Sequence, residues 1–118
     1  MSATSSVIRV GDSAANANKA KLTVGENVTI TSPKCFGITV FGVNNTDADL
    51  TTSDIELVIN GKVNVTGTEA GVSGNGTNTL SATTITIGNT AEIISEKDYA
   101  IYHPGKGTLT VNGKVEGK

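Results

Sequence analysis

The sequence predicts an all-β solenoid, in which the chain winds in successive coils and equivalent strands stack on one another. Three observations support this prediction. A short pattern, in which alternating apolar residues flank a tight turn with Gly or Asn, recurs along the chain. Its copies return roughly every 30 residues, a period typical of repeat architectures. Only 36% of the 118 residues are hydrophobic and 3% are aromatic, so the core must consist of small aliphatic side chains in a regular array.

The first two strands of each coil come from the recurring pattern, which is clearest over residues 57–65. Thr and the other β-branched residues suit pleated strands, whereas Asn and Gly suit tight turns. The other copies occupy residues 22–30, 85–93 and 109–117. A third strand is expected after each complete copy, over residues 36–40, 70–74 and 99–103. Ile8–Val10 is expected to be the same third strand of an earlier, incomplete coil.

Aligning the copies arranges the apolar residues in columns that are expected to stack along the solenoid axis. The first strand gives two columns, which are Leu22, Leu57, Ile85 and Leu109, and Val24, Ile59, Ile87 and Val111. The second strand gives Val28, Val63, Ala91 and Val115, followed by Ile30, Val65 and Ile93. The third strand gives Ile8, Ile38, Val72 and Ile101. A buried aliphatic side chain contributes roughly 1.5–3 kcal/mol relative to exposure, so these columns make an adequate core.

The alignment also divides the chain into two parts. Residues 1–21 are expected to form an N-terminal cap with the initial strand, and residues 22–118 to form about three to four coils. The coils start at residues 22, 57, 85 and 109. The alternative fold is a Greek-key β-sandwich, which also has many short strands. A sandwich does not require one pattern to return with matched columns, so the solenoid is favoured.

The turn-flanking strands and two further stretches carry a resemblance to known proteins. These stretches are Gly37–Val40 and residues 100–111. They resemble right-handed parallel β-helix proteins, the pectate-lyase-like superfold, and more narrowly the repeat segments of bacterial surface (adhesin-like) proteins and phage fibre proteins. The resemblance covers roughly residues 20–118 and implies a right-handed parallel β-helix. It does not fix a function, because one fold serves many activities.

The catalytic groups of enzymes with this fold have no counterpart in the sequence. The resemblance implies calcium-binding Asp residues with a basic residue in lyases, and several Asp residues in adjacent coils in hydrolases. Here Arg9 and His103 are the only Arg and His, and no two Asp residues are adjacent. Sugar hydrolysis needs two opposed carboxylates, and none can be nominated. We expect no catalytic residue, no cofactor and no enzyme, with a non-catalytic or degenerate part of a polysaccharide lyase or hydrolase as an alternative.

The loops that precede the first strand of each coil differ in length, whereas the strands do not. Such insertions emerge on one side of a solenoid, often its binding side. Ligand contacts are expected mainly in the longest loop, and the candidates are Phe41, Asn44, Asn45, Asp47, Asp49 and Tyr102. No metal site is expected. Carboxylate oxygens bind calcium, but no ordered ligand series follows the weak candidates Asp47, Asp49 and Asp54.

Three other side chains are interpreted as structural. Phe36 and Tyr99 share a register with Ala70 between them, and their rings are expected to fill space at a corner of the coil. His103 is expected at a corner or cap position, because a lone His is a poor metal site. The exposed rings, with Tyr102 and Phe41 as the best candidates, are an alternative surface for stacking on sugars.

Charge and hydropathy limit the partners. The net charge is −2 and the basic residues are scattered, so nucleic-acid binding is not expected. No apolar run reaches membrane-spanning length, so membrane insertion is not expected either. A solenoid has open edges, and nothing near the C-terminus resembles a cap. We expect self-association through open coil ends or sides, as a homo-oligomer or filament, or continuation in a longer chain, with surface glycans as a further candidate partner.

These features predict a non-enzymatic structural or binding β-helix rod of a bacterial surface protein, which presents variable loops. The expected location is extracellular, at the cell surface. The alternative is a phage virion fibre or capsid-decoration protein that assembles into oligomers.

Overall fold

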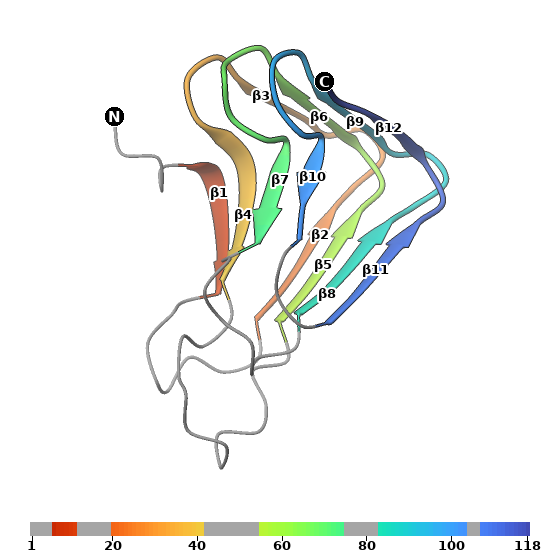
Figure 1. Cartoon of the computed structure of the whole chain (residues 1–118). Coiled ribbons are helices and arrows are strands. Elements are labelled where there is room, and N and C mark those ends of the chain that lie inside the picture. The colour runs from red at the N-terminus through yellow and green to blue at the C-terminus, as the bar shows by residue number, and fades with distance from the viewer. Residues whose placement is uncertain (1–5, 12–19, 42–54, 75–82, 104–106) are drawn as a thin grey trace.

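The computed structural model shows an all-β chain wound as a right-handed parallel β-helix, as the sequence predicts (Figure 1). The structure describes residues 6–11, 20–41, 55–74, 83–103 and 107–118. Within these residues the strands form three sheets of four strands each, and every pairing is parallel. The alternative β-sandwich is therefore wrong, since its sheets would be antiparallel.

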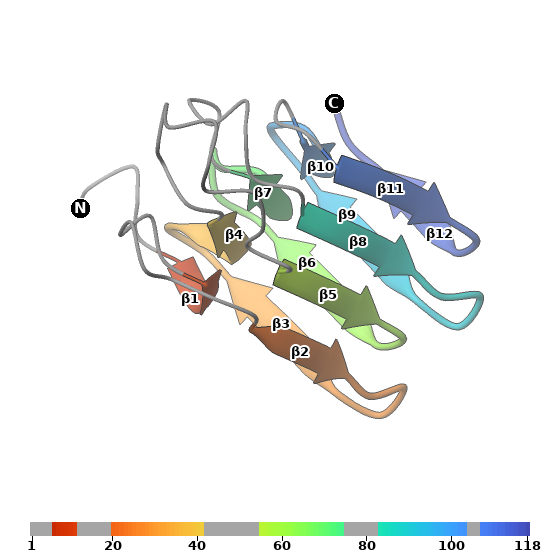
Figure 2. The same cartoon turned by 90° about the horizontal axis from the view of Figure 1, so that it is seen from below.

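Each sheet takes at most one strand from each coil (Figure 2). Sheet A holds β1 (Ser6–Gly11), β4 (Phe36–Phe41), β7 (Val72–Gly74) and β10 (Ile101–Tyr102). Sheet B holds β2 (Lys21–Val24), β5 (Ile55–Ile59), β8 (Thr83–Ile87) and β11 (Gly107–Val111). Sheet C holds β3 (Thr29–Ser32), β6 (Lys62–Val65), β9 (Glu92–Ser95) and β12 (Lys114–Glu116).

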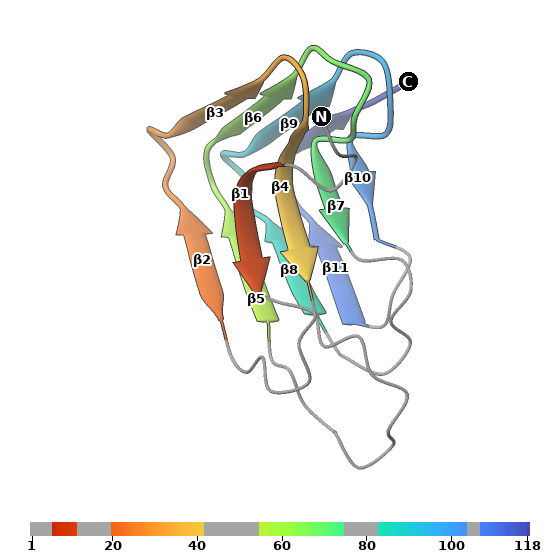
Figure 3. The same cartoon turned by 90° about the vertical axis from the view of Figure 1, so that its left-hand side faces the viewer.

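Consecutive strands define the coils. Coil 1 is β2–β3–β4, coil 2 is β5–β6–β7, coil 3 is β8–β9–β10, and coil 4 is β11–β12. Strand β1 pairs with β4 and belongs to an earlier, incomplete coil, with Ile8 opposite Ile38 (Figure 3). The described residues include no helix, so none is long and apolar enough to cross a membrane.

The core consists of aliphatic columns inside the coils. In sheet B the register aligns Leu22, Leu57, Ile85 and Leu109 as one column, and Val24, Ile59, Ile87 and Val111 as the next. In sheet A the column is Ile8, Ile38, Val72 and Ile101. The members in coils 2 and 3 of sheet B are fully buried. Burial is complete there because a coil covers them on both sides.

Sheet C has a different register from the alignment of the sequence. Ile30, Val63, Ile93 and Val115 form one column, and Val65 lies between Ser32 and Ser95. Val28 does not align with Val63, and it is exposed in a turn. The expected columns across this turn are therefore wrong for coils 1 and 3, because their turns are two residues longer than those of coils 2 and 4.

The two turn lengths alternate along the helix. The long turns span residues 25–28 and 88–91, and each is closed by a hydrogen bond of 3.0 Å, from Val28 N to Gly25 O and from Ala91 N to Gly88 O. The short turns are Asn60–Gly61 and Asn112–Gly113. The structural repeat is thus two coils. Residues 22–40 match residues 85–103 without a gap, and residues 57–66 match residues 109–118.

Candidate functional site

A groove lies at the corner where the chain passes from sheet C to sheet A. Its volume is about 380 Å³, within the range of small-ligand sites. We call it the corner groove. It is lined by Phe36, Glu69, Ala70, Ser73, Asp98, Tyr99 and Tyr102, which come from coils 1, 2 and 3.

The stacking of coils forms the groove. Gly37 N donates to Ala70 O at 3.4 Å, and Gly71 N donates to Tyr99 O at 3.2 Å, so residues 36, 70 and 99 lie one above the next. Neighbouring coils are about 4.8 Å apart, which places the Phe36 and Tyr99 positions about 10 Å apart. Ala70 is buried between them and has no ring. The missing ring at position 70 leaves the hollow between two aromatic walls.

Two stacked tyrosines form one wall of the corner groove. The ring centroids of Tyr99 and Tyr102 are 5.9 Å apart and the ring planes differ by 14°. Tyr99 is 57% exposed and Tyr102 is 44% exposed. The interpretation of Tyr99 as a space-filling corner residue is therefore wrong, because the small side chain of Ala70 leaves its ring uncovered. The two exposed rings thus contact each other, and Tyr102 belongs to strand β10.

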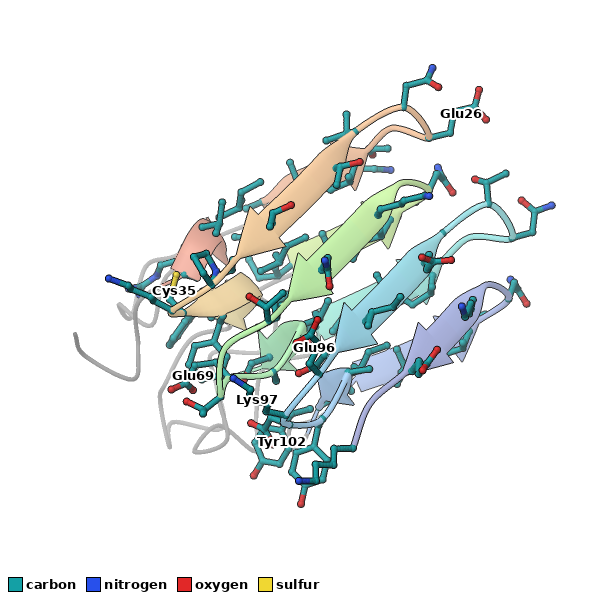
Figure 4. All side chains as sticks on the ribbon, turned by 90° about the horizontal axis from the view of Figure 1, so that it is seen from above. Glu26, Cys35, Glu69, Glu96, Lys97 and Tyr102 are labelled. Atoms are coloured by element: carbon teal, nitrogen blue, oxygen red, sulfur yellow. The ribbon has the colours of Figure 1, made fainter. Side chains whose placement is uncertain are left out.

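Carboxylates supply the polar side of the corner groove. Glu69 and Asp98 are half-buried, and the described residues that line the groove include no basic side chain. Ser95 Oγ donates to Glu69 O at 3.0 Å, which holds the backbone of Glu69 in place. Figure 4 shows Glu69 and Tyr102 toward the corner end of the coils. The groove therefore offers flat apolar faces beside hydrogen-bond acceptors.

Of the ligand candidates from the sequence, the structure places only Tyr102 in the corner groove. Phe41 does not line it, and the guanidinium of Arg9 lies 4.1 Å from the centre of the Phe41 ring. The remaining ligand and calcium candidates lie outside the described residues; they are Asn44, Asn45, Asp47, Asp49 and Asp54.

Sequence reasoning missed most of the groove. The useful signal was the shared register of Phe36, Ala70 and Tyr99, in which a small residue separates two rings. Nothing in the sequence indicated that Glu69 and Asp98 would line a groove, because each lies in a corner whose backbone path depends on the neighbouring coils. Nothing indicated this for Ser73 either, since a Ser in a strand is usually structural.

His103 and Cys35 do not line the corner groove, although they are next in sequence to Tyr102 and Phe36, which do. Neither ring nitrogen of His103 has a hydrogen-bond partner among the described residues, and burial lowers the pKa of His103 below the ordinary value of 6.5. Cys35 is a half-buried free thiol whose Sγ lies 3.2 Å from Ser32 Oγ. In the described part of the chain, no group of three or more His, Cys, Asp and Glu residues could hold a metal ion.

Comparison of the chain with protein-family models, with curated proteins and with solved structures finds no match.

Proposed function

We propose that this protein is a non-catalytic structural and binding element of a bacterial cell surface, and that its corner groove binds carbohydrate. The observation that carries the proposal is that aromatic and acidic residues line the same groove. These residues are Phe36, Tyr99, Tyr102, Glu69 and Asp98. The class of ligand follows from these side chains, and the structural role follows from the stacked core.

Sugar rings match the chemistry of the corner groove. A pyranose has an apolar face of C–H groups, which packs against the electron-rich face of an aromatic ring. Its hydroxyl groups donate hydrogen bonds, and ionised carboxylates are strong acceptors of such bonds. The rings of Tyr99 and Tyr102 stack on each other, and both residues line the groove together with Glu69 and Asp98. Both kinds of contact are thus available to one ligand.

The β-helix holds the backbone of the groove residues in place before a ligand arrives. The groove residues belong to three consecutive coils, whose backbones are joined by hydrogen bonds from Gly37 to Ala70 and from Gly71 to Tyr99. Ordering side chains on binding costs affinity, so a preformed site loses less. A stiff scaffold with exposed aromatic rings suits a protein that holds surface glycans without changing them.

The proposal can be tested with a panel of soluble oligosaccharides, followed by calorimetry on the tightest ligand. Tyr99→Ala and Tyr102→Ala should each weaken binding by about tenfold, since each removes a stacking face. Phe41→Ala is the matched control, because it removes a ring that does not line the groove. It should bind like the parent.

Three results would contradict the proposal. They are the absence of binding to every oligosaccharide, equal binding by the Tyr99→Ala variant and the parent, and turnover of any oligosaccharide in the panel, which would favour an enzyme. Circular dichroism of each variant separates loss of the site from loss of the fold.

A further inference from the structure

The charged side chains that line the corner groove all have the same sign. Glu69 and Asp98 are both acidic, and no Lys, Arg or His is among the described lining residues. Lys34 and Lys97 are close in sequence to the lining residues, but both are exposed and neither lines the groove. A ligand in the groove therefore meets two carboxylates and no basic side chain from the described residues.

Ion pairs do not neutralise these two carboxylates within the described part of the chain. The ion pairs found there join side chains of sheets B and C, namely Lys21 with Glu56, and Lys114 with Glu92 and Glu116. Neither Glu69 nor Asp98 belongs to such a pair. Both are half-buried, and burial reduces the screening of a charge by water. Their charges therefore act on a ligand that enters the groove.

The hydrogen-bonding groups of the groove are mainly acceptors. An ionised carboxylate only accepts hydrogen bonds, which applies to Glu69 and Asp98. Ser73 is buried, and its Oγ donates to Gly74 O at 3.3 Å, so its oxygen is left to accept from a ligand. The two tyrosine hydroxyl groups are the donors among the described side chains of the lining. The groove thus favours a ligand that brings many donors of its own.

Neutral and acidic sugars differ in charge and in hydrogen bonding. A sugar hydroxyl is uncharged and can donate, whereas the carboxylate of a uronic acid or a sulfate group is negative and only accepts. In the corner groove such an anion would be repelled by Glu69 and Asp98. It would also lose its water without gaining a basic partner, which is costly for a charge. Both effects disfavour an acidic sugar.

We propose that the corner groove selects neutral sugars and excludes sugars that carry a carboxylate or a sulfate. This inference rests on the proposed function, because it narrows the class of carbohydrate that the same groove binds. The selection comes from the charges of Glu69 and Asp98 and from the surplus of acceptors around the two tyrosine rings.

The test compares oligosaccharides that differ only in whether the exocyclic carbon of each sugar is an alcohol or a carboxylate. The probes are tetramers of glucose and of glucuronic acid with one linkage, and tetramers of galactose and of galacturonic acid with another. Each is titrated into the full chain by calorimetry. The neutral member of a pair that binds should bind at least about a hundredfold more tightly than the acidic member.

Variants of the two carboxylates should change this ratio of affinities. The double variant Glu69→Gln/Asp98→Asn keeps the side-chain shapes and removes both charges, so the preference for the neutral sugar should fall below about tenfold. A hydrogen bond that both sugars lose would weaken both alike and leave the ratio unchanged. Asp98→Lys supplies a basic partner and should make the acidic tetramer the tighter ligand. Circular dichroism checks that each variant is folded.

Glu96→Gln is the matched control. Glu96 is exposed in the same corner as Asp98 but does not line the groove (Figure 4). This variant changes the net charge by the same amount as Asp98→Asn. At about 0.15 M salt, where exposed charges are screened over about 8 Å, its preference for the neutral sugar should stay within about threefold of that of the parent.

The outcomes separate this inference from the proposed function. An acidic tetramer that binds the parent as tightly as its neutral partner would overturn the inference and leave sugar binding intact. A preference for the neutral tetramer that persists in both the double variant and Asp98→Lys would also overturn it. Absence of binding by every neutral and acidic sugar would reject the proposed function, and this inference with it.

Discussion

Lys62 donates its backbone N–H to the carbonyl oxygen of Val28 at 2.9 Å. Strand β6, which follows the short turn of coil 2, therefore begins beside the end of the long turn of coil 1. This bond joins two turns of unequal length without a break in sheet C. It brings Ile30 into register with Val63. The alternation of turns is thus compatible with continuous columns, because each short turn lies against a long turn of the preceding coil.

The close approach of these turns predicts a strong effect at Gly61. A Cβ atom there would overlap the carbonyl oxygens of Gly25 and Val28. We expect Gly61→Ala to lower the free energy of unfolding by about 1–3 kcal/mol, the usual cost of overpacking. Gly25→Ala is the control, since space at Gly25 is open, and its effect should stay within about 0.5 kcal/mol. Urea denaturation of both variants gives the comparison, and equal losses would refute the steric argument.

Most of the fold could be predicted from the sequence, because each coil repeats the same pattern of strands and turns. Leu22, Leu57, Ile85 and Leu109 stand at equivalent places before a turn, and period-two alternation fixes which side chains face inward. The register across the turn was mispredicted for a physical reason. Val28 and Ile30 both fit the alternating pattern, and only the turn hydrogen bond from Val28 N to Gly25 O shows that Val28 lies in the turn and Ile30 in the strand.

Position along the axis should determine the cost of removing a leucine. Leu57 is fully buried in coil 2, whereas Leu22 occupies the same column at the edge of the sheet and is half-buried. Leu57→Ala should cost about 2–5 kcal/mol, and Leu22→Ala clearly less, because its loss leaves a smaller cavity. Chemical denaturation measures both values. A larger loss at Leu22 would contradict the packing that the columns imply.

The corner groove was less predictable than the core. Tyr102 was a candidate because an aromatic residue near a corner has a chance of exposure. The partnership of Tyr102 with Glu69 depends on coils 2 and 3 meeting at one corner, and the sequence shows no such contact. Corners vary in length between coils, so the alternation that fixes the strands gives no constraint there. Contacts between corners could be found only from the structure.

Acidification should destabilise the fold through His103. Burial disfavours the charged imidazolium, so the pKa of His103 lies below 6.5 in the folded chain. The unfolded chain therefore binds the proton first as the pH falls, and stability present above about pH 6.5 decreases toward the folded pKa. Thermal unfolding at about pH 7.5 and about pH 5.5 should show a lower midpoint at the acid pH, above the range in which carboxylates usually titrate. The thermal unfolding midpoint of the His103→Gln variant should fall less between these two pH values. A parent protein that is equally stable at both pH values would exclude the effect.

The carboxylates of the corner groove should distinguish a neutral sugar from a cationic ligand. Glu69→Gln and Asp98→Asn keep the shape of each side chain and remove its charge, so each should weaken oligosaccharide binding by about tenfold if a charge-assisted hydrogen bond is lost. Binding of a neutral sugar should change little between roughly 0.1 and 1 M salt, whereas a cation attracted by the two carboxylates would be screened. Glu26→Gln is a matched control, because Glu26 lies in the exposed turn between β2 and β3 and does not line the groove. Calorimetric titration at both salt concentrations gives the answer. A steep loss of affinity with rising salt concentration would indicate that the ligand is a cation and not a sugar. The aromatic pair would then bind it through cation–π contacts.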